Sequence, residues 1–207
     1  MNRRKFLTSS SSLALSTYLM SYSGSSLASL IENTGLKDVF KDKFSFGTAL
    51  STATLSGLGN SSDQLKLVAK EFSSITPEND FKWANLRPKP NSWGWDLADK
   101  FVEFGQENNM QMVGHALVWH SQIPDNVFFD KKNKMLPRSH LLATMEEHIN
   151  TVVGRYRGKI HVWDVVNEAF KGGRWRKSHW YNGIGEDYFE HAFRFAQNAD
   201  PSAQLMY

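Results

Sequence analysis

Cysteine is absent from this 207-residue sequence, which excludes disulfide bonds and thiolate chemistry and leaves only His and carboxylate side chains for a metal site. The seven histidines show no HExxH or comparable spacing, so we expect neither a metal ion nor another cofactor. Long hydrophobic runs are scarce as well. The weakly apolar residues 13–20 fall far short of the ~20 residues that a membrane-spanning helix needs, so an integral membrane protein is not expected.

The formal charge of +3 originates at the N-terminus. Residues 1–28 contain Arg3, Arg4 and Lys5 and no acidic residue, so the remaining sequence carries +3 − 3 = 0, and it has no basic stripe that would indicate a nucleic-acid partner. The basic start, the weakly apolar middle and the small residues around Ala28 resemble a bacterial twin-arginine export signal. We therefore expect a periplasmic or secreted protein with no membrane association after signal removal; a disordered Ser-rich tail or an uncleaved anchor is the alternative.

From position 44 onward, short apolar runs alternate with amphipathic ones, which predicts βα units that feed a parallel sheet. The predicted strands cover 44–50, 73–78, 111–120, a run from 160 to the Asn167-Glu168 pair, and a fifth that begins at 203. Helices are predicted around 65–72, 97–104 (capped by Asp96), 139–156 and 188–196, with Leu142 on the buried stripe of the third.

This order is typical of an α/β fold of the (β/α)8 TIM barrel type, of which about four βα units and the start of strand five are present. A closed barrel typically needs ~250 residues, whereas roughly 180 follow position 28, so we interpret 29–207 as the N-terminal part of a barrel; a small open sheet is the alternative.

Polar and aromatic residues cluster behind three of the predicted strands, and the opposite ends of these strands carry no such clusters. The clusters are Thr76-Pro77-Glu78-Asn79 with Lys82-Trp83, the segment 114–122, and Asn167-Glu168. Because α/β barrels keep their chemistry at the C-terminal ends of the strands, this asymmetry predicts an active site there. Taken alone, the last pair could equally begin a solvated loop.

Strict alternation along the third strand places His115 and Trp119 on one face and His120 on the other. We expect His115 and Trp119 to look into the barrel as part of a wall for a polyhydroxylated ligand; a structural histidine and a core tryptophan are the alternative reading. Along the fourth strand, Asp164 shares the face of Glu168. A buried Asp164 needs a partner, and the sequence does not identify it.

Together, the motifs Thr76-Pro77-Glu78-Asn79 with Lys82-Trp83, the segment 114–120 and the segment 163–168 resemble those of glycoside hydrolase family 10, the endo-β-1,4-xylanases on a (β/α)8 barrel. The resemblance runs from about 46 to 207. It implies that Glu168 is the general acid/base and that Asn167 contacts the 2-OH of the sugar at the cleavage site. His115 and Trp119 would line the same subsite. The residues implied to hold the neighbouring xylose are Glu78, Asn79, Lys82 and Gln122.

The resemblance also implies a retaining double displacement. Glu168 would protonate the glycosidic oxygen while a second carboxylate, ~5–5.5 Å away, attacks the anomeric carbon. Family members supply this nucleophile as a glutamate at the end of strand seven, which the sequence does not reach. Glu78 and Asp80 lie near the proposed cleft, but nothing marks either as a nucleophile. We therefore expect the 207-residue chain by itself to be catalytically inactive, or nearly so, and poorly soluble.

Xylan and xylo-oligosaccharides are the expected partners, and the full-length protein is expected to be a monomer. Two alternatives stay open. One is a non-catalytic xylan-binding half-barrel, and the other is a related barrel glycosidase that acts on β-1,4-glucans, since such enzymes also end a strand in Asn-Glu. The segment 115–122 and the cluster of Glu78, Asn79 and Lys82 favour xylan.

Overall fold

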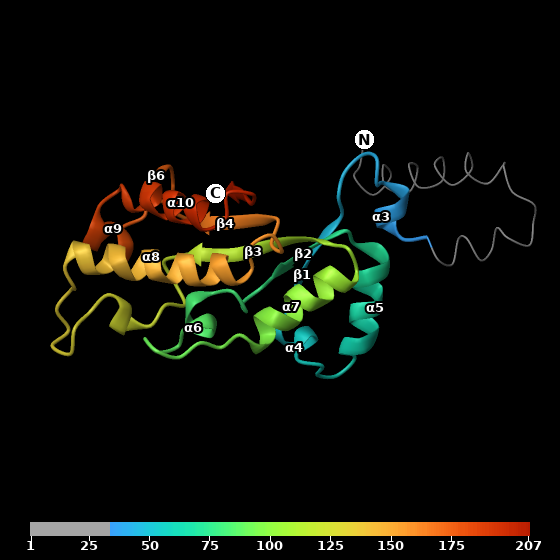
Figure 1. The fold of residues 1–207 in the computed structure, drawn as a ribbon, viewed down its shortest axis with the longest axis horizontal. Coiled ribbons are helices and arrows are strands. Elements are labelled where there is room, and N and C mark those ends of the chain that lie inside the picture. The colour runs from blue at the N-terminus through green and yellow to red at the C-terminus, as the bar shows by residue number, and fades with distance from the viewer. Residues whose placement is uncertain (1–33) are drawn as a thin grey trace, which may run out of the picture.

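The computed structural model describes residues 34–207, so the export signal predicted for residues 1–28 lies outside the described range. Five strands form one sheet in which every neighbouring pair is parallel and the spatial order follows the chain (Figure 1). In that order the strands are β1 (Gly47–Leu50), β2 (Ser74–Pro77), β3 (Gln111–Val118), β4 (Val162–Val166) and β7 (Gln204–Met206). The five predicted strands are confirmed, each somewhat shorter than expected.

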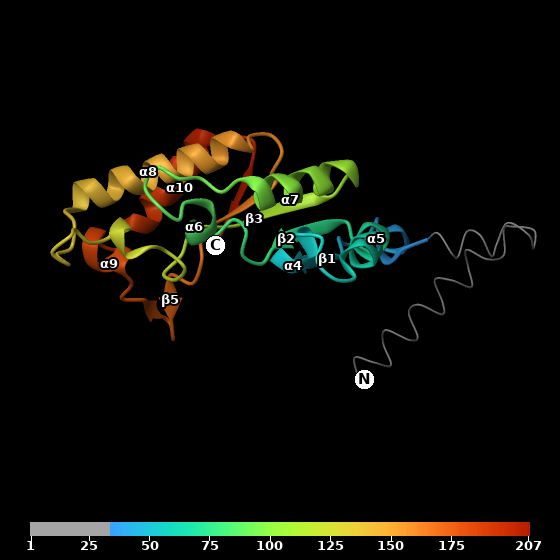
Figure 2. The same ribbon diagram turned by 90° about the horizontal axis from the view of Figure 1, so that it is seen from below.

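Four longer helices alternate with the strands: α5 (Ser61–Glu71), α7 (Asp96–Glu107), α8 (Arg138–Arg155) and α10 (Tyr188–Ala199). Helices α7, α8 and α10 lie along the same side of the sheet (Figure 2). Parallel strands in chain order with helices between them are the arrangement of successive units in a (β/α)8 barrel. None of the helices between residues 34 and 207 is long and apolar enough to cross a membrane.

Shorter elements, which the sequence did not predict, occupy the loops. They are α3 (Leu36–Val39), α4 (Thr52–Leu55), α6 (Trp83–Leu86), a 3-10 turn η1 (Asp125–Val127), α9 (His179–Ile184), and a separate hairpin of β5 (Phe170–Lys171) and β6 (Arg174–Trp175). Except for α3, these elements follow the C-terminal ends of sheet strands. They therefore shape the edge of the sheet where the predicted site residues lie.

Two details of the helix predictions are wrong. On α8 the buried residue is Leu141, with no exposed surface, whereas Leu142 is only partly buried. The stripe that starts at Leu141 continues at positions four and eight residues later, Met145 and Ile149, as the helical period requires. Asp96 does not cap α7 but is its first residue, after an N-cap at Trp95. Its carboxylate still lies in the first turn, where the helix dipole favours negative charge.

The alternation expected along β3 also fails. The register with β4 shifts between His115 and Val118, and Ala116, Leu117 and Val118 are all buried. Because of this irregularity, the residues that follow β3 do not continue a simple two-residue period. His120, expected on the face away from the site, instead lies beside Glu168.

Packing beneath the site gives a first prediction. A Cβ added to Gly114 would overlap the benzene ring of Trp163, which is fully buried and packs edge-on against Phe81. We expect Gly114→Ala to lower the free energy of unfolding in urea by about 2 kcal/mol, because the core has no room for the methyl group. Gly154→Ala on α8 is the control, since nothing lies within 4 Å of its added Cβ. Equal effects of the two substitutions would contradict the packing argument.

Candidate active site

The strand ends are tied together at the position of Glu168. The backbone N–H of Asn167 donates to the carbonyl of Val118 at 2.9 Å, which joins the end of β4 to the end of β3. Glu168 comes next and shares a small cavity with Asn167, Trp119 and His120. The Glu168 side chain is about half exposed (48%), so it is held at the strand ends and remains accessible to a ligand.

Two basic side chains approach the same oxygen of this carboxylate. Nη2 of Arg176 lies 3.3 Å from Oε2 of Glu168, and Nδ1 of His120 lies 3.5 Å from it. Burial lowers the pKa of His120, and the positive charge of Arg176 lowers it further, while the charge of Glu168 opposes both effects. The ring of His120 is therefore held in its neutral form next to a charged guanidinium and a carboxylate.

The partner that Asp164 required is His115. Their side chains meet at 2.8 Å between Oδ2 and Nδ1, and the two residues lie directly opposite each other in the ladder of β3 and β4. The aspartate side chain is 11% exposed and the histidine side chain 24%, so the pair is largely removed from water. Asp164 thereby fixes the ring orientation of His115 inside the sheet.

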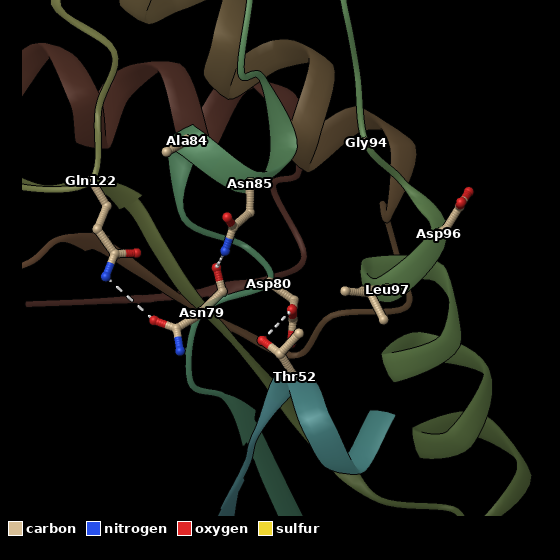
Figure 3. Close-up of a pocket in the computed structure, with 9 residues that line it drawn as sticks. All are labelled: Thr52, Asn79, Asp80, Ala84, Asn85, Gly94, Asp96, Leu97 and Gln122. Atoms are coloured by element: carbon tan, nitrogen blue, oxygen red, sulfur yellow. Dashed lines mark hydrogen bonds between the residues drawn. The ribbon is translucent and has the colours of Figure 1, made fainter. Parts of the chain in front are cut away.

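A second group of predicted site residues surrounds Asn79, just after β2. The Oδ1 atom of Asn79 accepts from Nζ of Lys82 at 3.1 Å and from Nε2 of Gln122 at 3.4 Å. Figure 3 shows the Gln122 and Asn79 side chains pointing toward each other, and both residues line a cavity of about 730 Å³. Both contacts use the amide oxygen, so the amide nitrogen of Asn79 is left to donate to a ligand.

Trp119 connects the two groups. Nζ of Lys82 lies 4.5 Å from the centre of its ring, while Trp119 also lines the cavity of Glu168. Its backbone carbonyl accepts from Nε1 of Trp180 at 3.0 Å, which anchors the segment after β3 to helix α9. The site thus combines an aromatic face, amide and ammonium donors and a carboxylate along one edge of the sheet. This combination suits a polyhydroxylated ligand, with a carboxylate at one end of the site.

The side chain of Glu78 bonds to neither of these two groups. The residue is exposed after β2, and its side chain makes no hydrogen bond within residues 34–207. The adjacent Asp80 is buried instead and accepts from the hydroxyl of Thr52 at 2.8 Å; burial raises its pKa, partly offset by this bond. No group of three or more His, Asp or Glu side chains in the described chain could hold a metal ion.

Sequence reasoning did not name several residues at this edge. Arg176 was missed, although two consecutive glycines, Gly172 and Gly173, signal a hairpin that returns the chain to Glu168. Thr52 and Asn85 were also missed: they line the larger cavity with Asp80 (Figure 3), and no spacing in the sequence indicates that they meet.

Comparisons with known proteins identify the family of the chain. The family model for glycosyl hydrolase family 10 matches residues 35–207. The chain is 40% identical over 180 residues to a β-1,4-xylanase of Dictyoglomus thermophilum, a match that covers 86% of this chain and 48% of the relative. It is 41% identical over 179 residues to endo-1,4-β-xylanase A of Thermotoga maritima, which covers 83% of this chain and 16% of the relative.

Solved structures of xylanases are also similar to this chain. A family 10 endoxylanase retrieved from a sugarcane soil metagenome is similar with a TM-score of 0.81 and 50% identity, over 84% of this chain and 50% of that one. Xylanase 10B of Thermotoga petrophila, solved with xylobiose, is similar with a TM-score of 0.78 and 37% identity, over 84% of this chain and 53% of that one. The chain spans about half the length of these two structures. Because the family model matches most of the sequence, the chain belongs to glycosyl hydrolase family 10, whose fold is the (β/α)8 barrel.

Proposed function

We propose that the chain carries the acid/base and sugar-binding part of an enzyme that hydrolyses internal β-1,4-xylosidic bonds of xylan. The observation that carries the proposal is the position of Glu168, accessible at the end of β4 and held beside His120. In the reaction, Glu168 donates its proton to the glycosidic oxygen as the bond breaks and later takes a proton from water. The relatives named above as β-1,4-xylanases support xylan as the substrate.

Sugar binding is proposed to divide between the two groups of residues. Asn167, His115 and Trp119 would surround the sugar at the bond to be cleaved. The adjacent xylose would be held by Asn79, Lys82 and Gln122, whose side chains already form one network, and by the exposed carboxylate of Glu78. Trp119 lies between the groups, so its indole ring can stack on a sugar while Lys82 binds the hydroxyl groups.

Catalysis needs one more group. A retaining hydrolase places a second carboxylate ~5–5.5 Å from the acid/base. Among the described residues that line the cavity of Glu168, no other residue is Asp or Glu. We therefore propose that these 207 residues bind xylo-oligosaccharides but do not by themselves form the glycosyl-enzyme. A non-catalytic xylan-binding role is the second candidate. The Asn79 network would bind the sugar, and Glu168 is the only acidic residue among the described residues that line its cavity.

Calorimetry and a xylan assay test the proposal. The purified 207-residue chain is expected to bind xylotetraose and to release no reducing sugar from xylan. Lys82→Ala should weaken binding about tenfold, since it removes a charged hydrogen-bond donor, whereas Lys100→Ala, at an exposed position of α7, should leave the affinity unchanged. If the 207-residue chain hydrolyses xylan and Glu168→Gln abolishes this activity, the expectation that the chain is inactive is wrong. Equal affinity for cellotetraose would favour a β-1,4-glucan as the substrate.

A further inference from the structure

The backbone of Glu168 is unusual. Its φ is +54°, in the left-handed region, which residues with a Cβ seldom occupy. Such a conformation is strained for a residue with a Cβ and persists only where the surrounding structure holds it. The residue that carries the proposed acid/base chemistry is therefore held in place by something other than its own conformational preference.

Arg176 contacts both the main chain and the side chain of Glu168. Its Nε donates to the backbone carbonyl of Glu168 at 2.9 Å, and its Nη2 donates to Oε2 at 3.3 Å. The planar guanidinium makes both bonds from one rigid group, which fixes the carboxylate relative to its own backbone. The ion pair between Arg176 and the exposed Glu168 carboxylate contributes little to stability by itself. The bond from Nε to the backbone carbonyl is therefore the contact that holds the backbone of Glu168 in place.

A local hairpin brings Arg176 to this position. Gly172 and Gly173 both have positive φ, +58° and +75°, as a two-residue turn between β5 and β6 requires. The rings of Phe170 and Trp175 meet across the hairpin at 4.3 Å. Directly after β6, the backbone N–H of Arg176 donates to the carbonyl of Ala169 at 2.7 Å. The hairpin therefore delivers the guanidinium to a residue eight positions earlier.

Two other basic residues, His120 and Lys171, lie near Glu168. His120, after β3, faces Oε2 at 3.5 Å, and its buried Nδ1 makes no hydrogen bond within residues 34–207. Lys171, on β5, adds positive charge that acts on His120 together with Arg176. Arg176 and His120 both approach Oε2, which leaves Oε1 of Glu168 as the oxygen open to a ligand.

We propose that Arg176 is a positioning residue of this site: it holds Glu168 in the left-handed conformation and points the free oxygen of its carboxylate at the ligand. The inference rests on the proposed function, because positioning matters only if Glu168 transfers the proton. Arg176 itself does not touch the sugar in this arrangement.

NMR of the 207-residue chain tests the positioning directly. The 13Cα and 13Cβ shifts of Glu168 report its φ, and the ring signals of His120 report the nearby charge. In Arg176→Gln we expect the Glu168 shifts to move toward extended values and the pKa of His120 to rise, since the positive charge of Arg176 that lowers it is lost. Arg176→Lys should keep the His120 titration, because the charge remains, but should not restore the Glu168 shifts. Arg174→Gln, an exposed cation on the same hairpin, should change neither.

Unchanged Glu168 shifts in both Arg176 variants would overturn the inference. The signals of Phe170 and Trp175 show whether the hairpin stays folded in Arg176→Gln. If it does not, the test rests on Arg176→Lys, and wild-type Glu168 shifts in that variant would overturn the inference. Titrations with xylotetraose test the proposed function independently of the NMR result. Absence of binding to the unmodified chain would contradict the function and leave the positioning result intact.

Discussion

Acidification from pH 7 to pH 4.5 is expected to cost this fold about 2.5 kcal/mol of unfolding free energy through His148 alone. The side chain has no exposed surface and stacks on Trp83, with ring centres 3.6 Å apart. Neither ring nitrogen has a hydrogen-bond partner within the described chain. Burial, together with the nearby charge of Arg87, lowers the pKa of His148 from 6.5 to about 3.

The sign follows from where the proton binds first. The unfolded chain takes up a proton near pH 6.5, whereas the folded chain resists it down to about pH 3. The stability is therefore fully present above pH 6.5 and is lost progressively as the pH falls between these two values. Urea unfolding at several pH values measures the slope.

Non-titrating variants isolate the contribution of His148. His148→Phe keeps an aromatic ring beside Trp83, and His148→Gln keeps a polar group; both should flatten the pH dependence between 6.5 and 4.5, whatever their stability at pH 7. His140→Gln, on an exposed position of the same helix, should retain the wild-type slope. A wild-type slope in both His148 variants would show that the acid sensitivity has another origin.

The sheet was predictable because each of its strands has a local signature. The run before Asn167 is rich in β-branched residues, as buried parallel strands are, and β4 is buried along its whole length. Short elements have no such signature. Helix α6 and the hairpin of β5 and β6 have too few residues for a period to appear, and tertiary contacts at the strand ends determine them.

The site was predictable in composition but not in pairing. Residues at the strand ends were identified by type, and the structure brings Asn79, Lys82 and Gln122 together as neighbours. The pairing of His115 with Asp164 joins residues 49 positions apart and depends on the register between two strands. The contact of His120 with Glu168 depends on the irregularity in β3, which breaks the alternation that the prediction used. Register and irregularity are properties of the folded sheet, not of either strand alone.

Removal of Asp164 is expected to damage stability and ligand binding together. Asp164→Ala should lower the free energy of unfolding by about 3 kcal/mol, because it leaves His115 without its partner in a largely buried position. The same substitution frees the His115 ring to rotate, so the affinity for xylotetraose should fall as well. Asp164→Asn should lose less of both, since an amide oxygen can still accept a hydrogen bond from Nδ1 of His115.

A second buried aspartate provides the matched control. Asp200 has no exposed surface and accepts from the backbone N–H of Gly158 at 2.9 Å and from Ser202, near the N-terminal ends of the strands. Asp200→Ala should therefore lower the unfolding free energy without changing the affinity for xylotetraose at 20 °C, where both variants remain folded. If the two substitutions weaken binding equally, the loss in Asp164→Ala reflects general destabilisation. If a folded Asp164→Ala protein keeps wild-type affinity, then His115 contacts the sugar without the help of the aspartate, or does not contact it.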